Sequence, residues 1–580
     1  MKFARLPAAG MAALALTTGT VITACGGGSL DAGMAANPQA VRMGAEADSF
    51  GLTEDTNFYT IDTGAGLVLK IRRTDNGVST QSAGDIASMV YNGVQYQDQT
   101  RGSQVNSGFD FLYTGVSAVN VAATTVGADV IKVTVTAGNL THYYIVKRGV
   151  NNVYMGTYFT TEPSTLGLAR YILRIPINAL PNGPVPSDLR GTTSTVESGD
   201  IFGLPNGETR SKHYSNMRLK DWQYIGATNN AGGVGMWVVR DNNEGNSGGP
   251  FYRSLLNQAT ATNQEITYIV NYGEAQTETL RTNILNQYTL VFNQGGAPDA
   301  GDTSFLGGLG LTGHVGAAGR GRVAGVGLSG MDPAHEYTVG FANSTAQYWA
   351  KADAGTGHFD STGMLPGTYT LKVYKNEYVV ASQSVTVTAG GTVALNTIDV
   401  AAGDPGKAVA QWRIGDWDGT PLEFINGSKL TTMHPSDVRM ASWLPGDFTV
   451  GTSSAATGFP AYQWKDVNGT LTVRFKLTSS QIANYQLRLG ITAAFAGGRP
   501  KPQINGWIPA NPAASSQPST RTLTVGTYRG NNTLYTFNVP ASELVVGDNV
   551  LTLTAISGSS GVKYLSPGYA WDALDFVKQP

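Results

Sequence analysis

Short runs of alternating residues constrain the fold of this chain more than any other feature. In these runs β-branched and aromatic side chains alternate with polar ones, a period of two that is typical of strands; the clearest cover residues 130–136, 143–146, 369–374, 471–477, 535–539 and 551–555. Seventy-three of the 580 residues are glycine, which suits the many tight turns of a β-sandwich. Helical periodicity is nearly absent, and we expect short helical turns only over 435–441 and 479–484. The pattern predicts an all-β chain.

At 580 residues the chain is too long for one hydrophobic core. Breaks rich in glycine and proline occur at 295–301 (GGAPDAG) and at 401–406 (AAGDPG). They divide the chain into predicted domains over 39–297, 302–400 and 406–580. The last of these holds six of the nine tryptophans, which form either a sugar-stacking platform or a core. Tryptophan is highly buried on average, so we expect most of them in the core: Trp412, Trp417, Trp443, Trp464, Trp507 and Trp571.

The first 24 residues are typical of a secretory signal, with Lys2 and Arg5 before an apolar run at 11–16. Cys25, the only cysteine, follows small residues and precedes three glycines, which resembles a bacterial lipobox with a lipid-modified cysteine. Ordinary cleavage nearby, with an idle thiol, is the alternative. Residues 25–38 are the expected tether. No later segment approaches the roughly 20 apolar residues that cross a bilayer, so we expect an exported chain that attaches to the outer membrane or cell surface only through this lipid, or is otherwise secreted.

The balance of charges excludes some partners and leaves few groups for proton chemistry. Thirty-nine basic and 41 acidic residues give a net charge of −2, so the chain lacks the basic field that a nucleic-acid backbone requires. Histidines number six. Against this background the segment 209–216, TRSKHYSN, places an amine, Lys212, beside an imidazole, His213, in a predicted loop-to-strand setting.

Ten sequence blocks carry a resemblance to a known family. They are TRSKHYSN (209–216), NSGGPFYR (246–253), GLARYILR (167–174), FANSTAQYW (341–349), GMLPGTYTLKVY (363–374), WRIGDWDGTPLEF (412–424), MHPSDVRMASW (433–443), FAGGRP (495–500), TYRGNN (527–532) and SGSSG (557–561). Together they resemble the fungal-type rhamnogalacturonan endolyases of polysaccharide lyase family 4. The resemblance implies a large N-terminal β-sandwich of the galactose-mutarotase type that carries the active site. A fibronectin-III-like sandwich and a C-terminal jelly roll similar to a carbohydrate-binding module follow it.

The reaction implied by the resemblance is β-elimination at the rhamnose–galacturonate linkage of rhamnogalacturonan I, which leaves an unsaturated galacturonate. It needs a base for the C5 proton, a cation for the C6 carboxylate and an acid for the departing O4. Lys212 matches the family's catalytic lysine, and its pKa must be depressed by burial or by neighbouring cations, with Arg210, Arg170 and Arg174 as candidates. Arg170 and Arg174 match the family's substrate arginines. Four residues apart on a strand, they face the same side, about 13 Å from each other.

One departure from the family leaves the proton donor open. The family has a histidine in a segment like NSGHxQTE, and here the stretch 271–278 reads NYGEAQTE, so that Glu274 stands at the histidine position. A protonated Glu274 is the predicted donor; binding a cation or an arginine are its alternative roles. Two family tyrosine positions carry Thr267 and Ile269, with Tyr268 and Tyr272 nearby as predicted substrate contacts. His213 is a weaker substitute, because neighbours on one strand point to opposite faces.

The C-terminal domain adds two expectations. Arg521 resembles a family arginine that reaches the substrate, and Asp572 with Asp575 suggests a structural calcium ion, although the chemistry itself requires no cofactor or metal. We expect a monomer whose partner is the polyanionic polysaccharide rhamnogalacturonan I. Two other functions stay open: a non-catalytic rhamnogalacturonan-binding lipoprotein, and a glycoside hydrolase that uses Glu274 and Glu278 as paired carboxylates.

Overall fold

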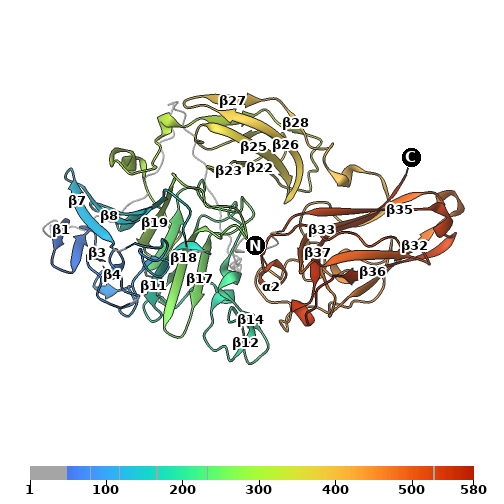
Figure 1. Ribbon diagram of the computed structural model, residues 1–580, viewed down its shortest axis with the longest axis horizontal. Coiled ribbons are helices and arrows are strands. Elements are labelled where there is room, and N and C mark those ends of the chain that lie inside the picture. The colour runs from blue at the N-terminus through green and yellow to red at the C-terminus, as the bar shows by residue number, and fades with distance from the viewer. Residues whose placement is uncertain are drawn as a thin grey trace, which may run out of the picture. The chain divides into compact units, whose positions relative to one another are not determined.

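The computed structural model describes residues 49–78, 80–116, 118–164, 167–230, 233–526 and 530–579, and strands dominate it (Figure 1). The all-β prediction is confirmed, because all six alternating runs lie within strands: β8 (Val130–Ala137), β9 (Leu140–Lys147), β25 (Gly367–Lys375), β32 (Thr470–Leu477), β35 (Thr533–Val539) and β36 (Gly547–Ile556). Helices within these ranges have five residues or fewer, and none is long and apolar enough to cross a membrane. Residues 479–481 form a 3-10 helix, η6, whereas 435–441 make turns instead of the expected helix. The predicted signal, the tether and Cys25 lie outside the described residues.

Four sheets make up the N-terminal part of the structure. The first has the order β1-β2-β3-β4-β5 (Gly51–Glu54, Phe58–Asp62, Leu67–Arg72, Ile86–Tyr91, Val94–Gln95). The largest has the order β15-β16-β19-β10-β9-β8-β7 and adds Tyr224–Thr228, Gly235–Arg240, Leu285–Asn293, Asn152–Phe159 and Asn120–Val126 to β9 and β8. A third runs β17-β18-β11-β6 (Leu255–Ala259, Asn263–Asn271, Ala169–Pro176, Gln104–Val105), and a small one runs β12-β13-β14 (Ser194–Glu197, Ile201–Gly203, Thr209–Arg210). One hydrophobic core draws on the first three sheets.

Strand β10 shows how the largest sheet is covered on both faces. All eight of its residues are buried, unlike those of β8, where Lys132, Thr134 and Thr136 point outward between buried valines. Val153 and Met155 of β10 face the main core. On the other side, Tyr154 and Tyr158 pack with leucines that follow the Gly/Pro-rich break: Leu306, Leu309 and Leu311. The segment after residue 301 thus packs on the first sandwich.

The middle part of the chain forms a smaller sandwich (Figure 1, yellow). Its main sheet has the order β23-β22-β25-β26, with β23 at Gln347–Lys351, β22 at Tyr337–Ala342 and β26 at Tyr378–Val387. The opposing strands form β24-β20-β27 (Phe359–Asp360, Arg322–Gly325, Thr392–Leu395) and β21-β28 (Leu328–Ser329, Ile398–Asp399). Residues of both sets meet in one core that includes Val323, Phe341 and Leu371.

The C-terminal part is a sandwich of two sheets (Figure 1, orange and red). One sheet has the order β29-β37-β33-β35, with β31 paired to β37 (Ala410–Gly415, Gly568–Lys578, Tyr485–Phe495, Tyr462–Trp464). The other has the order β30-β32-β36-β34 (with Phe448–Thr449 and Arg499–Ile504). Five of the six tryptophans here are buried, and Trp507 is half-buried against the same core. The prediction that most of them are core residues is confirmed.

Candidate active site

Lys212 lies on a single helical turn and not at the start of a strand. Strand β14 ends at Arg210, and η2, a 3-10 helix, covers Lys212–Ser215. The hydroxyl of Ser211 caps this turn by accepting the N–H of His213 at 3.2 Å. The hydroxyl of Ser215 donates to the carbonyl of Lys212 at 2.6 Å and accepts the N–H of Asn257, in β17, at 2.8 Å. The hydrogen bond to Asn257 therefore attaches this turn to the sheet β17-β18-β11-β6.

The amine of Lys212 is largely buried among charges of both signs. Its Nζ lies 3.8 Å from a carboxylate oxygen of Asp200, and 29% of its side chain is exposed. Burial is the main effect that lowers the pKa of Lys212; Asp200 and Glu265 raise it, whereas Arg170 and Arg253 lower it. Because the net shift is downward, the neutral amine is easier to form than in an exposed lysine. This is the property that a lysine base needs.

His213 is half-buried and lines a small pocket together with Asn216, Phe251, Tyr252 and Arg253. Burial, together with the positive charges of Arg253, Lys212 and Arg521, holds the pKa of His213 well below its usual range. Its Nδ1 makes no hydrogen bond within the described part of the chain. Protonation of His213 is therefore disfavoured. Its ranking as a weaker substitute assumed that it shares a strand with Lys212, whereas both residues lie on η2.

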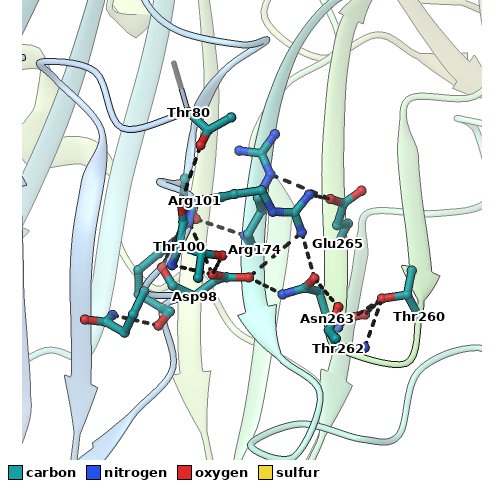
Figure 2. Close-up of polar contacts among 12 residues, drawn as sticks. Thr80, Asp98, Thr100, Arg101, Arg174, Thr260, Thr262, Asn263 and Glu265 are labelled. Atoms are coloured by element: carbon teal, nitrogen blue, oxygen red, sulfur yellow. Dashed lines mark hydrogen bonds and ion pairs between the residues drawn. The ribbon is translucent and has the colours of Figure 1, made fainter. Parts of the chain in front are cut away.

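Arg174 is held inside the protein (Figure 2). It stands directly opposite Glu265 in the pairing of β11 with β18, and its Nε lies 3.6 Å from Glu265. Its Nη1 donates to the carbonyl of Gly102 at 2.6 Å, and Arg101 donates to Glu265 at 2.8 Å. Burial lowers the pKa of Arg174, of which only 7% is exposed. The guanidinium therefore serves a network within the fold.

Arg170 differs from Arg174 although the two share strand β11. Its partner position across the sheet is Ile269, which offers no charge. The side chain is half-buried, and its guanidinium makes no hydrogen bond or ion pair with the residues that the structure describes. Burial lowers the pKa of Arg170. An unpaired, partly desolvated guanidinium beside Lys212 is suited to bind a carboxylate.

Arg253 and Tyr272 complete the neighbourhood of Lys212. The Nε of Arg253 donates to the hydroxyl oxygen of Tyr272 at 3.2 Å, and the guanidinium lies over the rings of Tyr272 and Tyr252, at 5.4 and 5.7 Å from their centroids. Its Nη1 is buried without a partner among the described residues. Burial raises the pKa of Tyr272, while Arg253 and Arg170 act in the opposite direction. Because the phenol oxygen accepts from Arg253, the phenol proton stays free for another acceptor.

Tyr268 and Glu274, both predicted for the site, lie in other surroundings. Tyr268 is 1% exposed, and its ring stacks on that of Tyr288 at 4.2 Å. Glu274 is exposed, accepts a hydrogen bond from the hydroxyl of Thr279 and raises the pKa of Glu162. It is not among the charges with the largest effects on the pKa of Lys212. The structure thus connects Tyr272 to Lys212 through Arg253, and it shows no such connection for Tyr268 or Glu274 among the described residues.

Arg521 is linked to Lys212 by the carboxylate of Asp200, which contacts both side chains. Its Nη1 donates to one oxygen of Asp200 at 2.6 Å, while the other oxygen of Asp200 faces Lys212. Its Nε donates to Glu197 at 2.9 Å, and the buried Glu197 also contacts His434 Nε2 at 3.2 Å. Arg521 precedes the short helix α2 (Thr522–Val525), and a third of its side chain is exposed. Its guanidinium is therefore already paired with two acids.

Sequence reasoning missed two residues and proposed one neighbour that lies elsewhere. Arg253 ends the quoted block NSGGPFYR, which is the signal that could have found it. Asp200 sits in a turn between β12 and β13 with no such signal. Arg210, expected beside Lys212, instead pairs with Glu208 at 2.9 Å.

The carboxylates suggested for calcium have separate roles. Asp575 is bound by Arg413, Arg488 and the indole of Trp417, so it has no capacity left for a cation. Asp572 accepts two backbone N–H groups. Asp572 and Asp418 are buried and Glu423 is half-buried. Burial raises the pKa of each of the three carboxyl groups, that of Glu423 to about 9. In the described ranges, no three or more His, Cys, Asp or Glu side chains have the geometry to hold a metal ion. Of the two carboxylates suggested from the sequence, only Asp572 is left for a calcium ion, which stays a prediction.

Comparison with known proteins places this arrangement in a family. The family description "Rhamnogalacturonan lyase B, N-terminal" matches residues 50–313, and "Polysaccharide lyase family 4" domains II and III match 319–395 and 410–576. Rhamnogalacturonate lyase A of Emericella nidulans is 39% identical over 533 residues, 91% of this chain and 96% of that protein. The chain belongs to polysaccharide lyase family 4. The protein of the same name from Aspergillus aculeatus is 38% identical over 535 residues, 91% of this chain and 96% of its own length.

Membership of polysaccharide lyase family 4 confirms the resemblance inferred from the ten sequence blocks. The three matched segments fall on the three groups of sheets: strands up to Asn293, then Arg322–Asp399, then Ala410–Lys578. The residues around Lys212 lie in the first segment, and Arg521 comes from the third. The candidate site of this family member therefore draws on two of the three segments.

Proposed function

We propose that this chain is a rhamnogalacturonan lyase that cleaves the rhamnose–galacturonate linkage of rhamnogalacturonan I by β-elimination. The observation that carries the proposal is the partly buried amine of Lys212, whose pKa is lowered by burial and by Arg170 and Arg253. The relatives from Emericella nidulans and Aspergillus aculeatus, each of which matches 91% of this chain, are named rhamnogalacturonate lyase A, which supports the same substrate class.

In the proposed reaction, the neutral amine of Lys212 takes the C5 proton of the galacturonate. The electron pair of the C5–H bond forms the C4–C5 double bond as the C4–O4 bond breaks, and O4 leaves with a proton from an acid. Negative charge builds on the C6 carboxylate on the way, and the unpaired guanidinium of Arg170 is placed to neutralise it. The positive charge of Arg253 disfavours protonation of Lys212.

Two groups compete for the role of proton donor to O4. Glu274 has the position of the family's histidine and an exposed carboxyl group. Tyr272 has the contacts, because its hydroxyl accepts from Arg253 and its proton is free to donate. A raised pKa keeps the Tyr272 phenol protonated at neutral pH. We propose Glu274 as the donor because it stands at the family's histidine position in the sequence. Tyr272 is the second candidate, because its hydroxyl contacts Arg253.

The positive charge that elimination requires comes from the protein's own side chains. Arg170 and Arg253 already place two cations beside the neutral amine of Lys212. We therefore propose that the elimination step uses no metal ion. We also propose that the protein acts as a monomer. EDTA is expected to leave the activity unchanged. Light scattering is expected to give a particle mass of 61.0 kDa or less.

The test of the function is incubation of the purified protein with rhamnogalacturonan I. A lyase produces an ultraviolet absorbance from the new conjugated double bond, together with shorter chains. A rhamnogalacturonan-binding lipoprotein would be retained on a rhamnogalacturonan gel without this absorbance. A glycoside hydrolase would release reducing ends without a double bond. Only the first result agrees with the proposal.

We also propose that the protein is exported and anchored by a lipid on Cys25. The support is the sequence of residues 1–28 alone, which lie outside the described residues. Mass spectrometry of the membrane fraction is expected to find a lipid-modified N-terminal Cys25, and Cys25→Ser is expected to release the protein in soluble form.

A further inference from the structure

A groove of about 660 Å³ lies between the middle sandwich and two loops of the first one. One wall is the sheet β23-β22-β25, and the other includes Gly248–Pro250 and residues 278–281. The volume is in the range of about 300–1,000 Å³ that is usual for ligand sites. None of Lys212, Arg170 and Arg253 lines this groove, so it is separate from the site described above.

Three positions form a row across the sheet wall. Gly340, in β22, pairs directly with Trp349 in β23 on one side and with Lys372 in β25 on the other. Residues directly opposite each other in paired strands project from the same face of a sheet. The row therefore presents an indole and an ammonium group on one face of the sheet, on either side of Gly340.

This face of the sheet points away from the core. The alternate residues of the same strands, among them Val339, Phe341 and Leu371, are buried in the core of the middle sandwich. Lys372 is exposed and Trp349 is half-buried. A Cβ on Gly340 would lie 3.1 Å from the ring of Tyr374, tighter than ordinary van der Waals contact. Glycine at position 340 thus lets the ring of Tyr374 approach the backbone of β22 closely.

The two walls are fixed to each other by Gln347 and Glu244. The side-chain oxygen of Gln347 accepts the N–H of Gly249 at 3.0 Å, and its backbone N–H donates to the carbonyl of Glu244 at 3.0 Å. The carboxylate of Glu244 accepts two hydrogen bonds from Arg320, at 2.6 and 2.9 Å, and one from Tyr348 at 2.7 Å. Because Glu244 is buried, water competes little with these charge-assisted hydrogen bonds. They stabilise the contact between the two walls of the groove.

The chemistry of the row suits a chain of acidic sugars. The indole offers a flat apolar face on which the C–H face of a sugar ring can stack. Lys372 makes no ion pair with the residues that the structure describes, so its charge is free for a carboxylate. A neutral ligand would not use the amine, and a small anion would not use the indole.

We propose that this groove is a second binding site for the polysaccharide, in which Trp349 stacks on a sugar ring and Lys372 pairs with a uronate carboxylate. The inference rests on the proposed function, because it takes the same uronate-containing polymer as the ligand. Its role is to hold the chain away from the point of cleavage.

The test measures binding of rhamnogalacturonan I by calorimetry in a Lys212→Ala background, where the polymer is expected to stay intact. Trp349→Ala is expected to weaken binding about tenfold and Lys372→Ala about fivefold, as for central residues of a binding site. The conservative variants Trp349→Phe and Lys372→Arg are expected to keep most of the affinity. Lys476→Ala, which removes an exposed charge from the C-terminal sandwich, and Thr368→Ala, on the same strand as Lys372, are the matched controls.

Binding by Trp349→Ala and Lys372→Ala that equals that of the two controls would overturn the proposal. Equal losses in Lys372→Ala and Lys476→Ala would also overturn it, since bulk charge would then explain the binding. Circular dichroism checks that Trp349→Ala is folded. If Trp349→Ala does not fold, Lys372→Ala alone tests the site. Double-bond formation is measured separately with Lys212 intact, so that failure of the lyase function and failure of the groove give different results.

Discussion

The carboxylate of Asp200 stands 3.8 Å from the amine of Lys212, and its second oxygen accepts a hydrogen bond from Arg521 at 2.6 Å. Asp200 therefore connects the proposed base to a residue of the third segment, 309 positions away in the chain from Lys212 (521 minus 212). The charge of Asp200 raises the pKa of Lys212, and Arg521 offsets part of that charge. The protonation of the base depends on both partners.

Asp200→Asn is expected to move the acid limb of the pH profile of kcat/KM to lower pH. Removing the carboxylate removes an effect that raises the pKa of Lys212, so more of the amine is neutral at a given pH. The measurement is the rate of double-bond formation across pH. Asp129→Asn, which alters an exposed ion pair with Arg148, is the control and should leave the profile in place. A limb that stays fixed in Asp200→Asn, or moves to higher pH, contradicts this role of Asp200.

Arg521→Ala is expected to move the same limb in the opposite direction. Without the guanidinium, Asp200 acts on Lys212 with its full charge and favours the protonated amine. Arg521→Lys should restore much of the wild-type profile. An arginine that acts only on the substrate, as the sequence suggests, would raise KM and leave the limb where it is. The pH profile separates these two roles.

Tyr272→Phe and Glu274→Gln separate the two candidate donors. The variant that removes the true donor is expected to lose about 10²–10⁴-fold in kcat, the usual contribution of general acid–base catalysis. The other variant should retain most activity. Tyr272→Phe keeps the ring between Tyr252 and Arg253, so only the hydroxyl is lost. Full activity in both variants would remove both groups from the mechanism.

The acids near Glu423 predict a pH dependence of stability. Burial raises the pKa of Glu423 to about 9, above its value of about 4.3 in an unfolded chain. The folded state thus binds the extra proton between these values, so stability falls as pH rises through this window. We expect a lower Tm at pH 8 than at pH 5, and Glu423→Gln should reduce the difference by at least about 2 °C, the shift that about 1 kcal/mol makes in a domain of this size. An equal pH dependence in the variant would exclude Glu423 as a cause.

Calcium removal tests the metal prediction at the same place. If a calcium ion binds at Asp572, the ion should raise the Tm at pH 8 more than at pH 5, because it competes with the proton on this acid. EDTA should reverse the effect, and Asp572→Asn should abolish it. An equal Tm with Ca²⁺ and with EDTA at pH 8 would remove the calcium prediction.

The strands were predictable because each run of alternating residues has one buried face, as in β8 and β32. The same alternation says little about β18, where all residues but Glu265 are buried and Tyr268 packs on Tyr288. Periodicity therefore could not show that Tyr268 is inaccessible. Nor could it show that Lys212 starts a helical turn, since the side chains of Ser211 and Ser215 hold η2 through hydrogen bonds to its backbone and to Asn257.

The residues of the site were predictable from the sequence only in part. Arg170 and Arg174 look equivalent in GLARYILR, yet the register of β18 puts Ile269 opposite one and Glu265 opposite the other. That difference decides which guanidinium is free, and nothing local to β11 encodes it. Pairings between distant segments, such as that of Asp200 with Arg521, were beyond sequence reasoning for the same reason.

The most direct test of the proposed mechanism is the ultraviolet absorbance of the new double bond, recorded for wild type and Lys212→Ala on rhamnogalacturonan I. Wild type is expected to produce the absorbance, and Lys212→Ala to lose at least about 10²-fold in rate while it keeps its fold and its binding of the polymer. Turnover by a folded Lys212→Ala at a rate near that of wild type would contradict the assignment of Lys212 as the base.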